Sequence, residues 1–219
     1  MRCLLRSSED SLRVKKLYEW ENARRKEASC IIGVDEVGRG PMAGPVVACA
    51  VILPAKPEIP RINDSKKLTS KTREQLFGLI VEISIAVGIG IRSAKFIDEN
   101  GISAATFSAM RMAIDEVIST GFEPGLVLVD GYPIPELEVK QEAIIKGDSK
   151  IASIACASII AKVVRDGIMT QYDRVYPGYR FSLHKGYCTR LHLDLLREKG
   201  PSPIHRKSFK PVREVINQG

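Results

Sequence analysis

The chain has 219 residues, of which 44% are hydrophobic, and it carries a formal net charge of +7. This length suits one large domain with a full core, or one domain with a helical appendage. No apolar run is long enough to span a membrane, and the first ten residues lack the features of a signal peptide, so we expect a cytoplasmic protein without membrane contact. The five cysteines show no Cys-x-x-Cys spacing, which argues against a disulfide framework or a structural zinc site.

Apolar periodicity predicts strands that alternate with helices along the chain. The predicted strands cover residues 31–34, 44–53, 85–91, 126–129 and 139–145. The predicted helices cover residues 8–28, 70–83, 103–120, 149–166 and 191–199. This alternation favours an α/β fold in which helices cover both faces of a sheet. We divide the chain into an N-terminal helical extension (1–30), a core (31–175) and a C-terminal helical and basic segment packed on the core (176–219), where no strand is predicted.

Two adjacent carboxylates, Asp35 and Glu36, end the first predicted strand. Successive side chains of a strand point to opposite faces, so the two can share one site only if the strand bends or stops there. Gly38 and Gly40 supply that freedom and let a ligand approach the backbone, while Arg39 between them can donate to a phosphate. Taken alone, the Asp-Glu pair favours the simpler interpretation of an acidic turn.

Asp130 and Asp148 are two further candidate carboxylates. Asp130 closes the apolar run 126–129, and ligand sites of open α/β sheets lie beyond the carboxyl ends of strands, although a plain Asp-Gly turn explains it equally well. Asp148 precedes a predicted buried helix, where it or Ser149 can serve as the N-cap. As a further metal ligand, Asp148 would lie at the mouth of the same site, and a helix N-terminus tolerates such an anion.

These carboxylates have the chemistry that phosphodiester hydrolysis requires. The reaction needs an activated water and a stabilised leaving oxygen, and two divalent ions about 3.5–4 Å apart can supply both. Mg²⁺ and Mn²⁺ prefer carboxylate oxygens, which acidic residues from separate strands provide. The motifs of the common rival chemistries, a P-loop, a Gly-x-Ser-x-Gly elbow and His-Glu-x-x-His, do not occur in the sequence.

Basic and polar stretches fit a nucleic-acid partner. Ser65 and Lys66 lie in a stretch whose hydroxyl and ammonium groups suit phosphate contacts, although it is also a natural helix start. Nine Lys and Arg residues against two acidic ones between residues 180 and 213 form a basic stripe. Within this stripe Tyr187 can stack on a sugar or base, and a half-buried structural tyrosine explains it equally well.

Six stretches, in this order, resemble bacterial ribonuclease HII. They are GVDEVGRGPMAGPVV (33–47), DSKKLT (64–69), VDG (129–131), KGDSK (146–150), ACASIIAKVVRD (155–166) and HKGY (184–187). The resemblance runs from about residue 31 to 209, and the first stretch alone is highly specific. Met42, Cys49 and Cys156 stand where the family more often has other small or apolar residues, and we expect none of them to touch the metal.

The resemblance implies a ribonuclease H-like mixed sheet flanked by helices, with a C-terminal helical segment. It implies a monomeric endonuclease that uses Mn²⁺ or Mg²⁺ to cut the RNA strand of RNA/DNA hybrids, and duplex DNA 5′ of single embedded ribonucleotides, by two-metal catalysis that leaves 3′-hydroxyl and 5′-phosphate ends. Asp35, Glu36 and Asp130 would bind the metal, and Asp148 would be the fourth catalytic acid. The implied substrate-binding residues are Gly38, Arg39 and Gly40, which would read the ribose 2′-hydroxyl, Tyr187, which would stack on the next sugar, and Ser65, Lys66 and Lys150.

Two alternatives stay open from the sequence alone. A non-catalytic hybrid-binding module would keep the basic stripe and Tyr187, but it would not need all four acidic positions. Another two-metal nuclease of the same fold, such as a junction resolvase, would need the acids but neither the Gly-Arg-Gly stretch nor Tyr187. Cleavage of DNA that lacks ribonucleotides would favour this second alternative.

Overall fold

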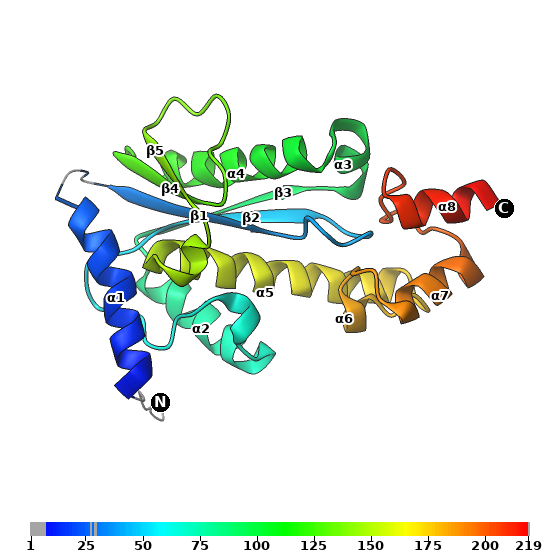
Figure 1. Cartoon of the computed structure of the whole chain (residues 1–219), viewed down its shortest axis with the longest axis horizontal. Coiled ribbons are helices and arrows are strands. Elements are labelled where there is room, and N and C mark those ends of the chain that lie inside the picture. The colour runs from blue at the N-terminus through cyan, green and yellow to red at the C-terminus, as the bar shows by residue number, and fades with distance from the viewer. Residues whose placement is uncertain (1–7, 27, 29, 219) are drawn as a thin grey trace.

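The computed structural model describes residues 8–26, 28 and 30–218. Its centre is a five-stranded mixed sheet (Figure 1). In spatial order the strands are β3 (Ala86–Arg92), β2 (Val46–Ile52), β1 (Ile31–Val37), β4 (Leu126–Asp130) and β5 (Gln141–Ile144). β3, β2 and β1 are antiparallel neighbours, whereas β1, β4 and β5 run parallel. The central strand β1 therefore has an antiparallel partner on one side and a parallel partner on the other.

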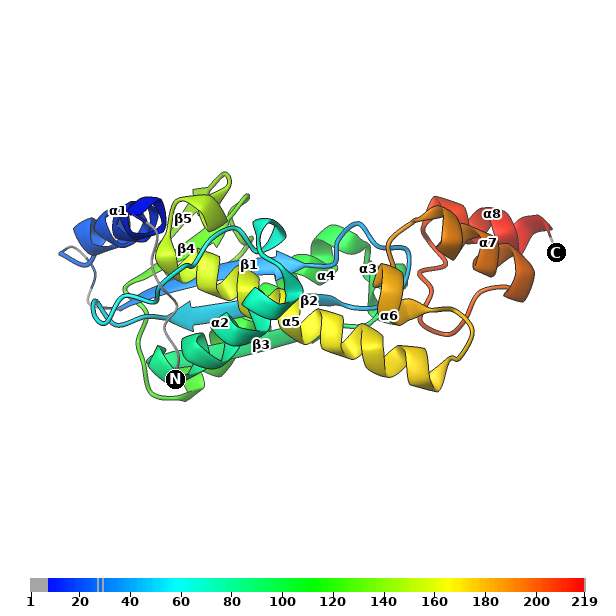
Figure 2. The ribbon, with the colours of Figure 1, turned by 90° about the horizontal axis from the view of Figure 1, so that it is seen from below.

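Helices cover both faces of the sheet, as the sequence predicts (Figures 1 and 2). The helices of these two layers are α2 (Ser70–Ile83), α3 (Ala94–Asn100), α4 (Ile102–Ser119) and α5 (Ala152–Val175). On β2, Val47 and Val51 pack with α5 and α2, whereas Ala48 and Ala50 pack with α4 and α3. Because both faces of β2 are buried, this strand is a continuous apolar run rather than an alternating one.

The N-terminal helix α1 (Ser8–Arg24) packs into the same core as α5. Leu17 is buried in the main apolar cluster. Glu21 is fully buried, and its carboxylate accepts a hydrogen bond from the backbone N–H of Ser153 at 2.8 Å. Glu21 thereby satisfies a donor at the N-terminus of α5 that would otherwise lack a partner. The sequence predicts this helix as far as residue 28, but it ends at Arg24.

The C-terminal segment lies at the opposite end of the molecule from α1 (Figures 1 and 2). Its helices are α6 (Phe181–His184), α7 (Arg190–Lys199) and α8 (Lys210–Gln218). Phe181 packs with Met169 of α5, and Leu196 and Val212 pack with Met42. Two small apolar clusters therefore attach this segment to the end of α5 and to the turn between β1 and β2.

Several boundaries differ from those predicted from the sequence. α5 continues to Val175 rather than ending at Asp166, because Met169 is buried against the C-terminal segment. β1 continues to Val37, since β2 pairs with it that far. The short helices α3, α6 and α8 were not predicted, because helices of this length depend on tertiary packing. No helix in the described residues combines the length and the apolar character needed to cross a membrane.

Candidate active site

The register of the sheet places Asp35 and Asp130 side by side. β1 and β4 are parallel, Val34 pairs with Val129, and the next residue of each strand is an aspartate. Asp35 lies on the face that α5 covers, because Gly33, two positions earlier, is in close contact with that helix. Two carboxylates distant in sequence therefore meet at the carboxyl ends of neighbouring strands, where open α/β sheets place their ligand sites.

Glu36 reaches the same edge although the strand does not stop there. β1 pairs with β2 as far as Val37, whereas its pairing with β4 ends at Val34. Beyond Val34, the edge of β1 that faces β4 therefore has no strand partner. The carboxylate of Glu36 forms an ion pair with Arg39 at 3.5 Å, and it is near enough to Asp130 for that charge to raise its pKa.

Asp148 lies at a hollow of about 330 Å³ beside Asp130. The other residues lining the hollow are Asp64, Lys66, Lys67, Lys146 and Ser149. Asp148 is in a short 3-10 turn (Gly147–Ser149), and the N–H of Gly147 donates to Asp130 at 2.6 Å. Neither Asp148 nor Ser149 caps α5, so that interpretation is wrong: Ile151 precedes the helix without a side-chain cap, and Glu21 supplies the acceptor.

Burial and mutual repulsion raise the pKa of Asp35, Glu36, Asp130 and Asp148, which we call the carboxylate edge. Burial is the largest cause for each group. The charges of Glu36 and Asp130 raise the pKa of Asp35 further, and those of Asp64 and Asp130 raise the pKa of Asp148. Asp64, which lies in the DSKKLT stretch, is thus a further carboxylate beside this edge. Negative charge gathered in this way favours a cation.

The donor set of the carboxylate edge fits a hard divalent cation, which prefers carboxylate oxygens. Among the described residues, however, no three His, Cys, Asp or Glu side chains already stand in an arrangement that would hold an ion. Protein donors engage these acids instead: the Glu36 N–H bonds to Asp35 at 2.7 Å, and the Gly147 N–H bonds to Asp130. The edge supplies the oxygen atoms and the charge that such an ion needs, and its side chains must draw closer together to enclose one.

The predicted substrate contacts Ser65, Lys66 and Lys150 have different surroundings. Lys66 is exposed and lines the hollow; burial lowers its pKa, but the neighbouring carboxylates, Asp148 first among them, raise it overall. Ser65 is buried, and its Oγ lies 2.9 Å from that of Ser158, which in turn bonds to the carboxylate of Asp35. The Nζ of Lys150 donates to a backbone carbonyl of its own loop. Only Lys66 of the three therefore lines the hollow.

The turn between β1 and β2, residues 38–45, is held from inside by two arginines, and we call it the arginine-held loop. Arg165 of α5 and Arg206 of the C-terminal segment are fully buried, and their guanidinium groups donate to loop carbonyls. The carbonyls that accept from these side chains, or from the backbone N–H of Arg206, belong to Gly38, Arg39, Met42, Ala43, Gly44 and Pro45. Neither arginine is among the site residues predicted from the sequence.

Contacts within the protein explain why one of the two predicted loop positions is glycine but do not explain the other. Gly38 has φ +100°, and a Cβ there would meet Nε of Arg165 at 2.4 Å. Gly40 is exposed, and a Cβ there would meet nothing within 4 Å. The fold therefore requires glycine at position 38, whereas nothing inside the described chain requires it at position 40.

Tyr187 presents its ring beside the buried arginines. The residue is 40% exposed, and its ring centre is 5.8 Å from the guanidinium carbon of Arg165 and 5.6 Å from Nζ of Lys162. Its backbone carbonyl accepts from Nδ1 of His192 at 2.9 Å. The ring of Tyr187 is thus partly exposed and can contact a ligand. The hydrogen bond to its carbonyl holds the backbone of the residue in place.

The basic stripe predicted between residues 180 and 213 is not one exposed surface. Arg206 is fully buried within it. Arg190 and Arg197 both lie within ion-pair distance of Asp194, at 3.9 and 3.4 Å. The free positive charge of this segment is therefore smaller than the sequence count indicates.

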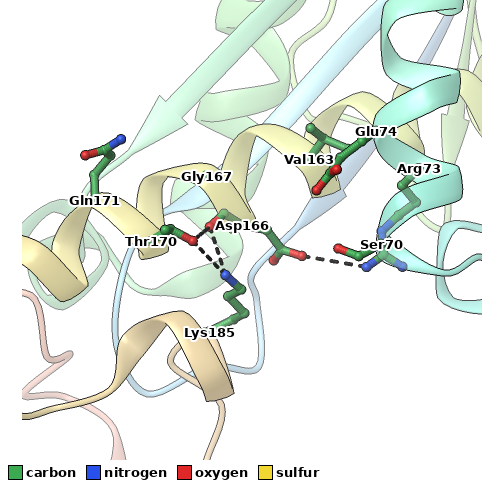
Figure 3. Close-up of a pocket in the computed structure, with 9 residues that line it drawn as sticks. All are labelled: Ser70, Arg73, Glu74, Val163, Asp166, Gly167, Thr170, Gln171 and Lys185. Atoms are coloured by element: carbon green, nitrogen blue, oxygen red, sulfur yellow. Dashed lines mark hydrogen bonds and ion pairs between the residues drawn. The ribbon is translucent and has the colours of Figure 1, made fainter.

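A second hollow of about 250 Å³ lies between α2 and α5 (Figure 3). Nζ of Lys185 donates to the hydroxyl of Thr170 and the carbonyl of Asp166 there. The Asp166 carboxylate points toward Arg73, 3.9 Å away, and also bonds to Lys162. The positive groups of this hollow already have acceptors, and the acids of the carboxylate edge are not among its lining residues.

Known proteins share both the sequence and the arrangement of these elements. The family model "Ribonuclease HII" matches residues 32–212. Ribonuclease HII of Lachnoclostridium phytofermentans is 52% identical over 197 residues, which cover 90% of this chain and 76% of the relative. Ribonuclease HII of Geobacter sulfurreducens is 49% identical over 204 residues, which cover 92% of each. The chain belongs to the ribonuclease HII family.

The crystal structure of ribonuclease H2 from Pyrococcus horikoshii OT3 matches with a TM-score of 0.73 and 25% identity, covering 86% of this chain and 98% of that one. This confirms the predicted ribonuclease H-like sheet with flanking helices. Ribonuclease HII is an endoribonuclease that acts on the RNA of RNA/DNA hybrids, and metal dependence is typical of the family. Family membership therefore favours the enzyme over the non-catalytic binding module.

Proposed function

We propose that this ribonuclease HII cuts duplex DNA on the 5′ side of a single embedded ribonucleotide, as well as the RNA strand of hybrids, by two-metal catalysis. The products carry 3′-hydroxyl and 5′-phosphate ends. The observation that supports this most is continuity: β1 leads from Asp35 and Glu36 directly into the arginine-held loop at Gly38. Groups suited to hydrolysis and groups suited to reading a sugar are therefore only a few residues apart.

In this proposal Asp35, Glu36 and Asp130 hold the ions, and Asp148 is the fourth acid. Bound Mn²⁺ or Mg²⁺ supplies an activated water and charge stabilisation for the leaving oxygen. The chain orients the acids: Ser158 and the Glu36 N–H fix the Asp35 carboxylate. The raised pKa values reflect negative charge that burial and crowding leave uncompensated, and this charge favours cation binding.

Ribose recognition falls to Gly38, Arg39 and Gly40, with Tyr187 beside them. The 2′-hydroxyl is the group by which a protein distinguishes RNA from DNA. Since no contact within the described chain requires glycine at position 40, close approach of a ligand to its backbone accounts for that residue. The partly exposed ring of Tyr187 can stack on the following sugar. Lys66, at the rim of the hollow, suits a phosphate contact.

Cleavage of a labelled DNA duplex that contains one ribonucleotide tests this proposal. The duplex is incubated with Mn²⁺, with Mg²⁺ and with EDTA, beside an all-DNA duplex of the same sequence. We expect a metal-dependent cut 5′ of the ribonucleotide and an intact control. Cutting of the all-DNA duplex would favour a nuclease of another specificity, and tight binding without any cut would favour a non-catalytic module.

Phosphate contacts predict that binding weakens steeply as salt rises, because Lys and Arg displace counterions from the nucleic acid. A flat salt response would contradict a binding surface built on cationic side chains.

We further propose that the enzyme acts as a monomer in the cytoplasm. Sedimentation of the free chain, and of the chain with one equivalent of duplex, measures both assembly states.

A further inference from the structure

The two buried arginines behind the loop have an uncommon set of partners. Arg165 donates to the carbonyls of Pro45, Ala43 and Lys185 at 2.9–3.1 Å. Arg206 donates to those of Gly44, Arg39 and Gly38 at 3.0, 2.9 and 2.5 Å. Within the described part of the chain, both guanidinium groups thus bond to backbone oxygens rather than to carboxylates.

This pattern determines which backbone atoms of the loop face outward. A carbonyl that bonds to a buried guanidinium points into the protein, so the remaining polar surface of the loop must be presented by other groups. The carbonyls of Gly38 and Arg39, next to the ribose-recognition position at Gly40, are both drawn inward by Arg206 alone. A planar guanidinium can hold two carbonyls in a fixed relation, which an ammonium group cannot do.

Arg206 is itself held in place by its own segment, residues 202–208, which we call the anchor segment. Its backbone N–H donates to the Met42 carbonyl at 2.9 Å. Immediately afterwards, the carboxylate of Asp98 at the end of α3 accepts from the backbone N–H groups of Lys207 and Ser208, both at 2.9 Å, and from the Ser208 hydroxyl at 2.6 Å. The anchor segment is therefore fastened to the body of the protein on both sides of the Arg206 side chain.

We propose that Arg206 is a positioning residue for ribose recognition: it holds the Gly38 and Arg39 carbonyls inward so that the loop presents its backbone at Gly40 to the 2′-hydroxyl. This inference rests on the proposed recognition role of the loop. It assigns to the C-terminal segment a part in specificity rather than only in phosphate binding. Asp98, about a hundred residues earlier in the chain, supports the same geometry from outside the site.

Arg206→Lys tests this role because it keeps the charge and removes the fork. Steady-state cleavage of a one-ribonucleotide duplex gives KM and kcat, and an all-DNA duplex used as a competitor gives Ki. We expect KM to rise about tenfold, the effect of losing roughly one well-placed hydrogen bond, while Ki stays within about twofold. An all-DNA duplex lacks the hydroxyl that the loop reads, so its Ki should not change.

Asp98→Ala provides a second variant on the surface, in case Arg206→Lys does not fold. We expect a smaller rise in KM, about threefold, again with Ki unchanged. The matched control is Arg25→Lys, whose guanidinium donates to the Leu53 carbonyl at 2.7 Å beyond the far end of β2. We expect its KM and Ki to equal those of the wild type.

Two results would overturn the inference. A fall in kcat with unchanged KM would show that Arg206 only maintains the folded fraction. A parallel rise in KM and Ki would show a general contact with nucleic acid. The proposed function is judged separately by the wild-type chain, since its failure would appear as equal treatment of the ribonucleotide-containing and all-DNA duplexes before any substitution is made.

Discussion

The carboxylate edge and the pair Arg165 and Arg206 are two groups of like charges; Asp35 and Asp148 are buried in the first, and both arginines in the second. The acids raise one another's pKa and accept few hydrogen bonds from the protein. The arginines bond to six backbone carbonyls. Charge removed from water thus has opposite roles here: the edge keeps uncompensated negative charge for the cation we propose, whereas the charges of the arginine pair are satisfied within the protein.

Substitution of Asp35 or Asp130 by Asn separates these purposes most strongly. Each change removes a proposed metal ligand, so we expect cleavage of the one-ribonucleotide duplex to fall by about a thousandfold or more. Because repulsion at the edge is relieved, we expect thermal stability to stay equal or to rise. Gel-based cleavage and calorimetry measure the two effects. Retained activity in both variants would refute the metal assignment.

Removal of an arginine should show the reverse pattern in stability. Arg165→Met leaves three carbonyls without their donor, and we expect unfolding free energy to fall by about 3 kcal/mol. Arg111→Met, which removes one exposed bond to the Pro135 carbonyl, should change it by less than about 0.5 kcal/mol. Urea unfolding compares the two variants. Equal losses would mean that burial of the Arg165 guanidinium is not what stabilises the loop.

The two glycines of the loop are expected to differ in the property that a substitution changes. Gly38→Ala forces a Cβ against Arg165 at a positive φ, so we expect a loss of about 2 kcal/mol in unfolding free energy. Gly40→Ala meets no protein atom and should leave stability unchanged while raising KM for the one-ribonucleotide duplex. Urea titrations and steady-state kinetics give both values. An unchanged KM in Gly40→Ala would contradict close approach of the ribose to this backbone.

A chain of neutral histidines behind Tyr187 predicts a smaller, pH-dependent effect. The Ser202 N–H donates to Nδ1 of His205, the Nε2 atoms of His205 and His192 lie 3.0 Å apart, and Nδ1 of His192 bonds to the Tyr187 carbonyl. The ring of His184 stacks on that of His192 at 3.9 Å. Burial, with a smaller contribution from the neighbouring histidines, lowers the pKa of His192 to about 3 and that of His205 to about 4.

The sign of the pH effect follows from these pKa values. In the unfolded chain the histidines bind protons below about pH 6.5, whereas in the folded chain they stay neutral down to about pH 4. Their contribution to stability is therefore complete above about pH 6.5 and is lost as the pH falls toward 4. As the pH falls from 7.5 to 4.5, the wild type should lose unfolding free energy relative to His205→Phe, because the raised pKa values of the carboxylate edge act in the opposite direction but equally in both proteins. Parallel curves would show that another group controls the effect.

The sequence predicted those parts of the site that depend on strand order and local motif. Asp35 and Asp130 end apolar runs, and the parallel register of β1 and β4 brings these two ends together. Gly38 and Gly40 are recognisable from the motif that contains them. The order and class of the sheet elements follow from apolar periodicity, since both faces of the sheet are buried.

The parts that escaped prediction depend on contacts between distant residues. From the sequence, Arg206 is one charge of a predicted basic stripe. Only the tertiary structure shows that six backbone carbonyls point toward Arg165 and Arg206. The sequence offers Asp148 as a helix cap as well as a fourth catalytic acid, because it does not show that Glu21 of α1 supplies the acceptor at the start of α5. Ser65 stays a predicted phosphate contact, and only the fold shows that its hydroxyl lies 2.9 Å from that of Ser158. The division of the chain at residues 30 and 175 stays a prediction.

Helix α5 sets the distance between the acid proposed for cleavage and the loop proposed for ribose recognition. Ser158, which orients Asp35, and Arg165, which holds the loop, are seven residues apart and so lie two turns apart on one helix face. At 1.5 Å per residue this fixes their separation along the axis at about 10 Å. Adding or deleting one residue between them would rotate one group by about 100° relative to the other. The distance from the proposed metal-binding acid to the loop proposed for ribose recognition is thus fixed by rigid secondary structure, and length variation in this part of the chain would be far less tolerable than substitution.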